Sequence, residues 1–132
     1  MAEKTRQVYL AAGYRAQATF RKLRDRLRPM EICVTARWID CKVASDDRDA
    51  DHYVRWADVD VLDVNAADTL VLFADLVGRK GGCWVEFGMA LARGMRIIVV
   101  GGRSNVFTYL DEVEHVETED DLVELLWKSE SA

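Results

Sequence analysis

The sequence has few of the residues that build metal centres or disulfide frameworks. It contains three cysteines, at positions 33, 41 and 83, and two histidines, His52 and His115. The cysteines are odd in number and none has a Cys-x-x-Cys spacing, which predicts neither a zinc site nor a disulfide framework. We therefore expect no metal and no other cofactor, and thiols that stay reduced in a cytoplasmic protein.

Basic residues are outnumbered by acidic ones, 18 to 23, and the sequence lacks long apolar runs. The net charge is -5, and a general affinity for nucleic-acid phosphates would need clustered Lys and Arg. The basic residues at 21–28 follow helical spacing and fit a solvated helix face. No run approaches the ~18 apolar residues of a membrane span, and no apolar leader follows the N-terminus. These features predict a cytoplasmic protein that binds neither nucleic-acid polymers nor membranes.

Continuous apolar runs predict a parallel sheet. The chain has 132 residues, about the size of one domain, and half of them are hydrophobic. Runs at residues 8–12, 69–74 and 96–101 are apolar without alternation, as in strands covered on both faces. A more mixed run at 31–38 suits a sheet edge. We expect residues 1–132 to form one flavodoxin-like or Rossmann-like α/β domain, a doubly wound sheet of four or five mainly parallel strands with helices on both faces.

Segments of helical period lie between these runs. Each has an apolar stripe or a residue that favours a helix end, such as a capping threonine or a left-handed glycine. The predicted helices are residues 14–28, ended by Pro29; 49–67; 83–93, closed by Gly94; and 118–128, opened by Thr118. The polar connection at 41–51 is long enough to form a mobile loop over a site.

The loops after the three apolar strands carry glycine beside polar or cationic residues. Ligands of an open parallel sheet bind outside the carboxyl ends of its strands, so these loops would converge on one mouth. The candidate binding residues are Gly13, Tyr14 and Arg15 after the first strand, Gly81 and Gly82 after the second, and Ser104 and Asn105 after the third. A strand-to-helix turn also needs glycine for steric reasons alone, so each loop by itself has an ordinary structural interpretation.

Three carboxylates stand out against their apolar surroundings. Glu86 falls in the first turn of the predicted helix 83–93, where the helix dipole would keep its pKa low and suit a nucleophile. The alternative is a carboxylate that only satisfies free amides of that turn. On the helix 49–67, Asp60 projects beside Trp56 at the edge of the apolar stripe, where a solvated position is the alternative. Asp63 projects inside the stripe, as a substrate contact or, preferably, a buried hydrogen-bonded Asp.

Taken in order, these residues resemble the nucleoside 2-deoxyribosyltransferase family, which includes the 2'-deoxynucleoside 5'-phosphate N-hydrolases. The resemblance spans residues 7–110. Its most specific part is the apolar strand that begins at Asp68, followed by a glycine loop and the Glu-x-Gly of Glu86 and Gly88. The spacing from Asp60 to Asp68 also agrees.

The resemblance implies a glutamate nucleophile, Glu86, that attacks the anomeric carbon of a nucleoside sugar and forms a glycosyl-enzyme intermediate. It implies that Asp60 helps to protonate the departing base and that Tyr9 orients the glutamate. The loop of Gly13 to Arg15 would lie near the 5' end of the sugar. Family members are dimers or larger oligomers in which a neighbouring subunit completes the site, so a homodimer is expected. This chemistry agrees with the separate environments predicted for the two carboxylates.

One position departs from the family pattern. Six residues before the glutamate the transferases carry an aspartate that helps to hold the base, whereas this chain has Lys80, next to Arg79. These two cations, with Arg15, Arg103 and Ser104 on neighbouring loops, could instead receive a 5'-phosphate. The alternative is that Arg79 and Lys80 are merely solvated.

Several functions remain open at the level of sequence. The sugar could pass to a second base, as in a 2-deoxyribosyltransferase, or to water, as in an N-hydrolase. The same fold could also carry a non-catalytic nucleotide-binding or signalling module, because this architecture hosts many unrelated functions. An NAD glycohydrolase would use a glutamate in a similar place, and a flavodoxin-like electron carrier would share the fold.

Overall fold

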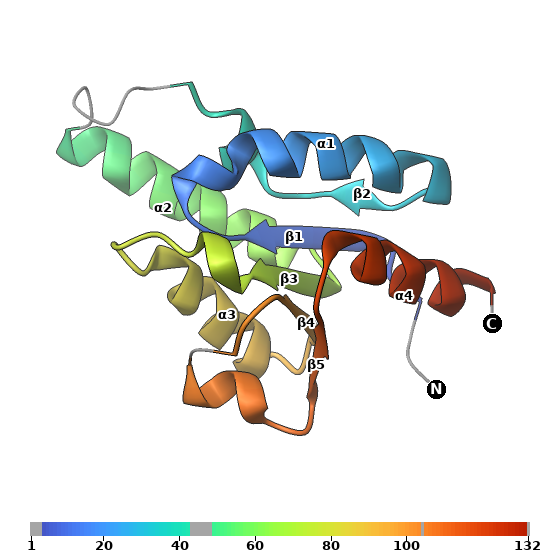
Figure 1. Cartoon of the computed structure of the whole chain (residues 1–132). Coiled ribbons are helices and arrows are strands. Elements are labelled where there is room, and N and C mark those ends of the chain that lie inside the picture. Colours follow the sequence, from blue (N-terminus) through green and yellow to red (C-terminus); the bar gives the residue numbers. More distant parts are fainter. Residues whose placement is uncertain (1–3, 43–48, 104, 132) are drawn as a thin grey trace.

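Five parallel strands form one sheet in the computed structural model, which describes residues 4–42, 49–103 and 105–131 (Figure 1). The strand order across the sheet is β2-β1-β3-β4-β5. The strands are β1 (Gln7–Ala11), β2 (Cys33–Val34), β3 (Thr69–Phe73), β4 (Arg96–Val100) and β5 (Val113–Val116). Every neighbouring pair is parallel. The predicted α/β doubly wound fold is confirmed.

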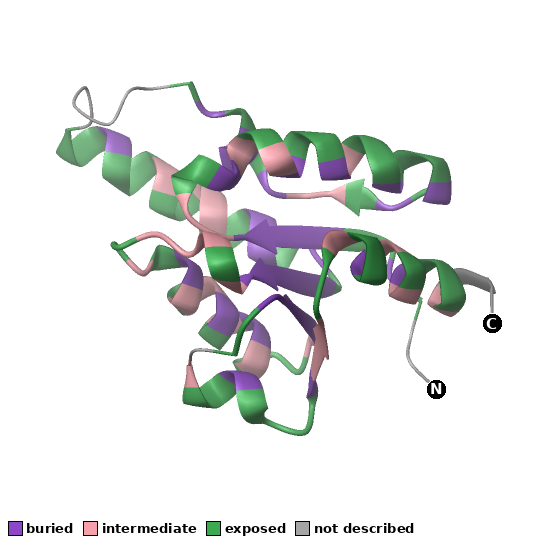
Figure 2. Ribbon diagram, in the orientation of Figure 1, coloured by how far each residue is buried: buried purple, intermediate pink, exposed green. Residues whose placement is uncertain are grey.

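The strands follow the apolar runs closely. β1, β3 and β4 are almost entirely buried, which explains why their sequences do not alternate (Figure 2). β2 lies at one edge, as the mixed composition of residues 31–38 predicts, although only two residues of that run pair. β5 forms the other edge and belongs to none of the four predicted runs. It contains Glu114 and His115 and is only partly buried, so its composition gives a weaker signal.

Four α-helices and five short 3₁₀ segments connect the strands in the described residues. The α-helices are α1 (Gln17–Leu27), α2 (Ala50–Asn65), α3 (Gly82–Ala92) and α4 (Glu119–Ser131). The 3₁₀ segments are η1 (Tyr14–Ala16), η2 (Arg28–Met30), η3 (Arg37–Asp40), η5 (Ala74–Leu76) and η6 (Val106–Tyr109). The first predicted helix therefore begins as a 3₁₀ turn, and the last runs about three residues beyond its predicted end.

The helix ends explain why these segments fold as they do. Asp49 caps α2, because its side chain accepts a hydrogen bond of 2.9 Å from the backbone of His52. Thr118 accepts one of 3.1 Å from the backbone of Asp121, as its predicted capping role requires. Gly94 follows α3 in the left-handed region with φ of 68°, which confirms the predicted helix end.

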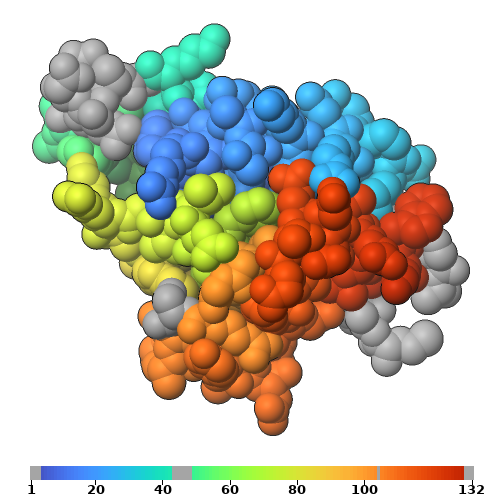
Figure 3. All heavy atoms as spheres, viewed as in Figure 1, coloured from blue at the N-terminus to red at the C-terminus, as the bar shows by residue number. Residues whose placement is uncertain are grey.

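The helices cover both faces of the sheet. α1 and α4 lie side by side, joined by ion pairs from Arg26 to Glu119 and Asp120 of 2.6 and 2.9 Å (Figure 3). α2 and α3 pack against each other, and Arg93 of α3 donates to Asn65 at the end of α2 over 2.7 Å. The core lies between these layers and the strands (Figure 2).

The strand order creates a crevice between the loops that follow β1 and β3. The chain leaves β1 toward β2 on one side, whereas β3 lies on its other side, and ligands bind at such a switch point. The two loops meet closely, because the backbone N–H of Gly13 donates to the carbonyl of Leu76 over 2.7 Å. A Cβ atom on Gly13 would lie 2.6 Å from the backbone nitrogen of Gly78. Glycine at position 13 is therefore required for this approach.

Two further predictions concern the polar connection at residues 41–51 and the absence of a membrane span. The polar connection predicted at residues 41–51 includes residues 43–48, which lie outside the described residues. Among the helices of the described chain, none combines the length and the apolar character needed to cross a membrane.

We predict that Gly13→Ala destabilises the fold by about 1–3 kcal/mol, because the new methyl group meets backbone atoms that cannot rotate away. Urea denaturation followed by circular dichroism would measure this loss. Gly88→Ala is the matched control, since a Cβ there meets nothing within 4 Å inside α3 and should raise stability by up to ~1 kcal/mol. Equal stability of Gly13→Ala and the unmodified protein would contradict the close approach of the two loops.

Candidate active site

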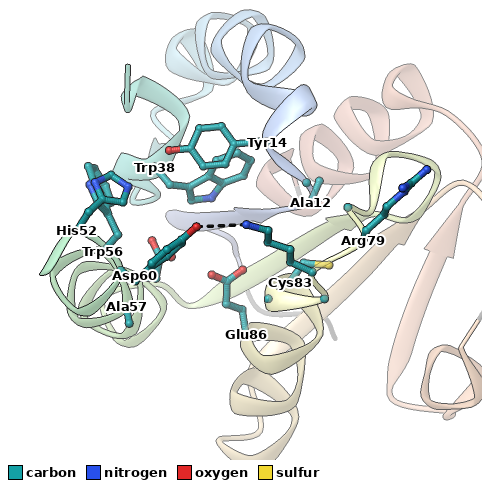
Figure 4. A pocket seen from close by; sticks show the side chains of 16 residues that line it. Ala12, Tyr14, Trp38, His52, Trp56, Ala57, Asp60, Arg79, Cys83 and Glu86 are labelled. Carbon is teal, nitrogen blue, oxygen red and sulfur yellow. Dashed lines mark hydrogen bonds between the residues drawn. The ribbon is translucent and has the colours of Figure 1, made fainter. Parts of the chain in front are cut away.

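A pocket of about 530 Å³ opens at the crevice between the β1 and β3 loops (Figure 4). That volume is in the range of small-molecule sites. Its walls come from the loop after β1, from Trp38 in η3, from the first turns of α2, from the glycine loop at 78–82 and from α3. The lining residues are Ala12, Gly13, Tyr14, Trp38, His52, Tyr53, Trp56, Ala57, Asp60, Gly78, Arg79, Lys80, Gly81, Gly82, Cys83 and Glu86.

Glu86 faces this pocket, and a hydrogen bond from Tyr9 holds its carboxyl group in place. The Tyr9 hydroxyl donates to Oε2 of Glu86 over 2.6 Å. Tyr9 is fully buried in β1, so its ring position is fixed by the core. Burial, and then the charge of Glu86, raises the pKa of Tyr9, which keeps the hydroxyl protonated as a donor. The contact that the family resemblance implies between these two side chains is present.

The predicted position and pKa of Glu86 are wrong. α3 begins at Gly82, so Glu86 lies in its second turn, beyond the free amides that a first-turn carboxylate would meet. Burial raises its pKa to about 8, the Tyr9 hydrogen bond opposes this increase, and the nearby Asp60 adds to it. Loss of water around the carboxyl therefore outweighs the helix dipole on which the prediction relied.

Asp60 shares the pocket with Glu86. Asp60 is half-buried on α2, so it does not belong to a fully solvated face of that helix. Its Oδ1 atom is buried and has no hydrogen-bond partner among the described residues. Burial raises its pKa to about 7; the charge of Asp63 also raises it, and Arg37 lowers it. Figure 4 shows Asp60 on α2 and Glu86 on α3, both beside the cavity. The site thus contains two carboxyl groups that retain protons near neutral pH.

Asp63 does not line the pocket. It is buried and paired with Arg37, whose guanidinium lies 2.8 Å from Oδ1, and whose backbone N–H donates to Oδ2 over 2.9 Å. The interpretation of Asp63 as a buried hydrogen-bonded residue is confirmed. Because Asp63 is not among the lining residues, the pocket does not favour the direct substrate contact that was also considered from the sequence.

Aromatic side chains form the wall across from the carboxyl groups. Trp38 is held by a 2.9 Å hydrogen bond from its indole N–H to the carbonyl of Leu10, and its ring packs edge-on against Phe20. Tyr14 lies over Trp38, with ring centroids 6.1 Å apart (Figure 4). His52, Tyr53 and Trp56 extend the wall along α2. Such a wall suits a flat ring system.

Trp38 and His52 were not among the residues predicted for the site. Trp38 follows the edge strand, and only the folded sheet brings it beside the loop after β1. The helical spacing of the sequence could have identified His52, because it lies one turn before Trp56 and two turns before Asp60 on the face of α2 that reaches the pocket.

The glycine loop supplies the cationic border of the pocket. Lys80 donates to the Tyr53 hydroxyl over 3.2 Å, and its ammonium lies 5.4 Å from the centre of that ring (Figure 4). Gly81 adopts a left-handed conformation with φ of 73° just before α3. Arg79, Gly81 and Gly82 all line the cavity. Lys80 is therefore not merely solvated, because it contacts α2 across the pocket.

Cys83 lies beside Glu86 but is not suited to nucleophilic attack. Burial, and then the charge of Glu86, raises the pKa of its thiol to about 11. The reactive form of cysteine is the thiolate, so this side chain remains protonated at neutral pH. Among the described residues, no cluster of three or more His, Cys, Asp or Glu side chains could hold a metal ion.

Of the described loop residues predicted to bind, Arg15 and Asn105 do not line the pocket. Arg15 is exposed and donates to the backbone carbonyl of Asp75 over 3.3 Å. Asn105 caps η6, where its side chain accepts a 2.9 Å hydrogen bond from Phe107. Ser104 lies outside the described residues. The structure thus gathers most of the candidates from the first two loops, namely Gly13, Tyr14, Lys80, Gly81 and Gly82, whereas Asn105 belongs to the turn that follows β4.

Comparisons with known proteins support the fold and leave the function open. The chain matches no protein-family model and no curated protein. It is similar to a solved structure described as a conserved protein from Enterococcus faecalis V583, with a TM-score of 0.64 and 20% sequence identity. The match covers 96% of this chain and 99% of that one. Likeness at this level of identity establishes a shared α/β fold over the whole domain.

Proposed function

We propose that this protein is an enzyme that cleaves the N-glycosidic bond of nucleosides, deoxynucleosides or their 5'-monophosphates through a covalent glycosyl-Glu86 intermediate. The observation that carries the proposal is the arrangement of Glu86: its carboxyl faces a pocket, accepts a hydrogen bond from buried Tyr9 and shares that pocket with a second, unpaired carboxyl on Asp60. A nucleophile and a separate proton donor are the two groups that this reaction needs.

The reaction would proceed in two displacements. In the first, the Glu86 carboxylate attacks C1' of the sugar, the C1'–N bond breaks, and its electron pair leaves with the base, which takes the proton of Asp60. In the second, water or another base attacks C1', Asp60 accepts the proton from that acceptor, and the ester bond to Glu86 breaks. Transfer to a base gives a 2-deoxyribosyltransferase, and transfer to water gives an N-hydrolase.

Both carboxyl groups titrate near the pH at which this scheme needs one proton between them. The pKa of Glu86 is about 8 and that of Asp60 about 7, so near neutral pH the pair readily holds one proton between them. The productive arrangement places the charge on Glu86 and the proton on Asp60. Tyr9 favours this arrangement, because its hydrogen bond stabilises the ionised form of Glu86.

The pocket wall supports a nucleoside as the substrate. Trp38, Tyr14 and Trp56 offer apolar ring surfaces for a base, on the side away from Glu86. Arg79 and Lys80 border the glycine loop before α3 and could receive a 5'-phosphate. Because they are present where the transferases carry an acidic residue, monophosphates are included among the proposed substrates.

We include a homodimer, or a larger homo-oligomer with a shared site, in the proposal. The outer faces of α2 and α3 expose Val54, Leu62 and Val85 by 60% or more of their surface. Apolar side chains exposed on two neighbouring helices suit contact with another subunit.

A second candidate is a non-catalytic nucleotide-binding module with the same pocket. The raised pKa of Glu86 favours it, because most of this carboxyl is protonated at pH 7 in the empty site and a protonated carboxyl is a poor nucleophile. Measurement of turnover distinguishes the two candidates.

We predict that the protein releases free base from at least one deoxynucleoside or deoxynucleoside 5'-monophosphate, and that Glu86→Gln reduces the rate by about 10³-fold or more. Chromatography of reactions with and without an acceptor base would measure release and separate hydrolysis from transfer. Mass spectrometry of acid-quenched enzyme should detect a bound sugar in the unmodified protein and none in Glu86→Gln.

Glu112→Gln is the matched control, because it removes an exposed carboxylate away from the pocket. It should retain the full rate. Tight nucleotide binding with no base release from any substrate, in the unmodified protein and in Glu86→Gln alike, would favour the binding module and contradict an enzyme.

We further predict that Tyr9→Phe lowers kcat/KM mainly at neutral and acidic pH. Loss of the hydroxyl removes a hydrogen bond that favours ionised Glu86, so the pKa of Glu86 rises further above its present value of about 8. Fewer molecules then carry the nucleophilic carboxylate, and each added pKa unit costs about tenfold in rate on the acidic side. A pH profile of kcat/KM between pH 5 and about 10 would test this.

The two enzymes should converge at alkaline pH, where Glu86 is ionised in both. Tyr109→Phe is the control, because it removes an exposed hydroxyl that donates to the backbone of Arg103. A loss of activity in Tyr9→Phe that is the same at every pH would indicate a structural role for Tyr9 only.

A further inference from the structure

Asp63 is a buried carboxylate with no place in the pocket. Only 5% of its surface is exposed. Arg37 fixes both of its oxygens, through the backbone N–H to Oδ2 at 2.9 Å and through the guanidinium to Oδ1 at 2.8 and 2.9 Å. The ion pair with Arg37 therefore holds the negative charge of Asp63 in one place inside the protein.

This charge lies close to the proposed acid. Asp63 follows Asp60 by three residues on α2, and residues at that spacing are neighbours on a helix surface. Asp60 makes no hydrogen bond through its buried Oδ1 atom to any described residue, so little else there stabilises an ionised form. After burial itself, the charge of Asp63 is the largest influence that raises the pKa of Asp60, and Arg37 acts in the opposite direction.

The other groups around Asp60 do not replace Asp63 in this role. Glu86 is a neighbour in the pocket, but its own charge changes during the reaction. Lys80 is engaged by Tyr53 across the pocket, and Tyr9 is a neutral donor. Among the described residues, the titratable or charged side chains around this pocket are Asp63, His52 and Tyr53 on α2, Arg37 on η3, Glu86 and Cys83 on α3, Tyr9 on β1, Tyr14 on η1, and Arg79 and Lys80 on the glycine loop.

We propose that Asp63 and Arg37 are positioning residues for the reaction, in which the fixed charge of Asp63 holds on Asp60 the proton that the leaving base takes, and Arg37 limits that effect. The proposal rests on the proposed function for its consequence in catalysis. Neither residue touches the substrate, since neither lines the pocket.

The consequence follows from where the one shared proton resides. The pKa values of Asp60 and Glu86, about 7 and about 8, lie close together, so a singly ionised pair divides its proton between the two carboxyl groups, and only molecules with the proton on Asp60 are productive. The ratio of molecules with the proton on Asp60 to molecules with the proton on Glu86 changes about tenfold when the difference between the two pKa values changes by one unit. By raising the proton affinity of Asp60 toward that of Glu86, Asp63 enlarges the productive fraction.

The test compares two substitutions that break the same ion pair. Asp63→Asn removes the negative charge and leaves Arg37, so the pKa of Asp60 should fall by about one unit. Arg37→Gln leaves the Asp63 charge without its counterion, so the pKa of Asp60 should rise by a similar amount, about one unit. A purely structural role for the ion pair predicts the same direction of change in both variants, whereas the proposal predicts opposite directions.

The first measurement needs no substrate. Carbon-detected NMR titration of the Asp60 carboxyl would give its pKa in each variant, in a Glu86→Gln background that removes coupled titration with the second carboxyl. Asp40→Asn is the control, because it breaks a comparable ion pair with Arg24 on the surface, outside the pocket. It should leave the pKa of Asp60 unchanged.

The second measurement is the pH profile of kcat/KM with Glu86 intact. Asp63→Asn should lose about tenfold at neutral and alkaline pH and approach the unmodified enzyme at acidic pH. Arg37→Gln should be faster than the unmodified enzyme on the alkaline side and equal to it on the acidic side. This pattern is the reverse of that expected for Tyr9→Phe.

The two measurements separate the possible failures. If no variant and no unmodified protein releases base, the proposed function fails, and the NMR titration still decides whether Asp63 sets the proton affinity of Asp60. The proposal for Asp63 and Arg37 is overturned if the pKa of Asp60 changes in the same direction in both variants, or if it changes in neither variant. Should Asp63→Asn not fold, Arg37→Gln decides alone, because Arg37 is 60% exposed and its replacement buries nothing new.

Discussion

The hydrogen bond between Tyr9 and Glu86 ties the chemistry of this site to the core of the fold. Tyr9 lies in a central strand, is fully buried and cannot move without disturbing the sheet, whereas Glu86 belongs to a helix that packs on that sheet. The bond therefore fixes the direction in which the Glu86 carboxyl points, and it does so at the carboxyl edge of the sheet, where a doubly wound fold leaves a crevice. A carboxyl without this contact would be free to turn toward solvent, and its position near Asp60 in the pocket would be lost.

Burial gives the same two carboxyl groups their unusual proton affinities. Each loses water on entering the crevice, and this loss raises the pKa of Glu86 and of Asp60 more than any nearby charge does. The neighbouring groups then act on a pair that is already close to titrating at neutral pH. Tyr9 lowers the pKa of Glu86 and Asp63 raises that of Asp60, so both influences bring the two values together. The fold thus supplies the general environment, and individual side chains adjust it.

The sequence predicts the fold better than it predicts the site. Buried parallel strands such as Thr69–Phe73 are apolar throughout, and that pattern survives in a single sequence because both faces are covered. In a parallel sheet, the loops at the carboxyl ends of neighbouring strands β1 and β3 lie at the same edge, which explains why Gly13, Lys80 and Gly82 line one pocket. Trp38 escaped prediction because it reaches the pocket from a segment whose path depends on tertiary packing. The prediction of a low pKa for Glu86 was wrong for a similar reason, because a sequence does not show how much water surrounds a side chain in the folded protein.

A site with two partly protonated carboxyl groups is also well matched to a reaction that develops positive charge. In the empty pocket, shared protons reduce the repulsion between Glu86 and Asp60 and so limit the free energy that their burial costs the folded state. During cleavage of a glycosidic bond the sugar becomes oxocarbenium-like, and a carboxylate beside it is then stabilised by the opposite charge. Burial removes much of the water around the Glu86 carboxyl, so in the proposed reaction the negative charge on Glu86 would be favoured most strongly as the transition state forms. The burial that makes Glu86 a weak acid would then strengthen its interaction with the reacting sugar.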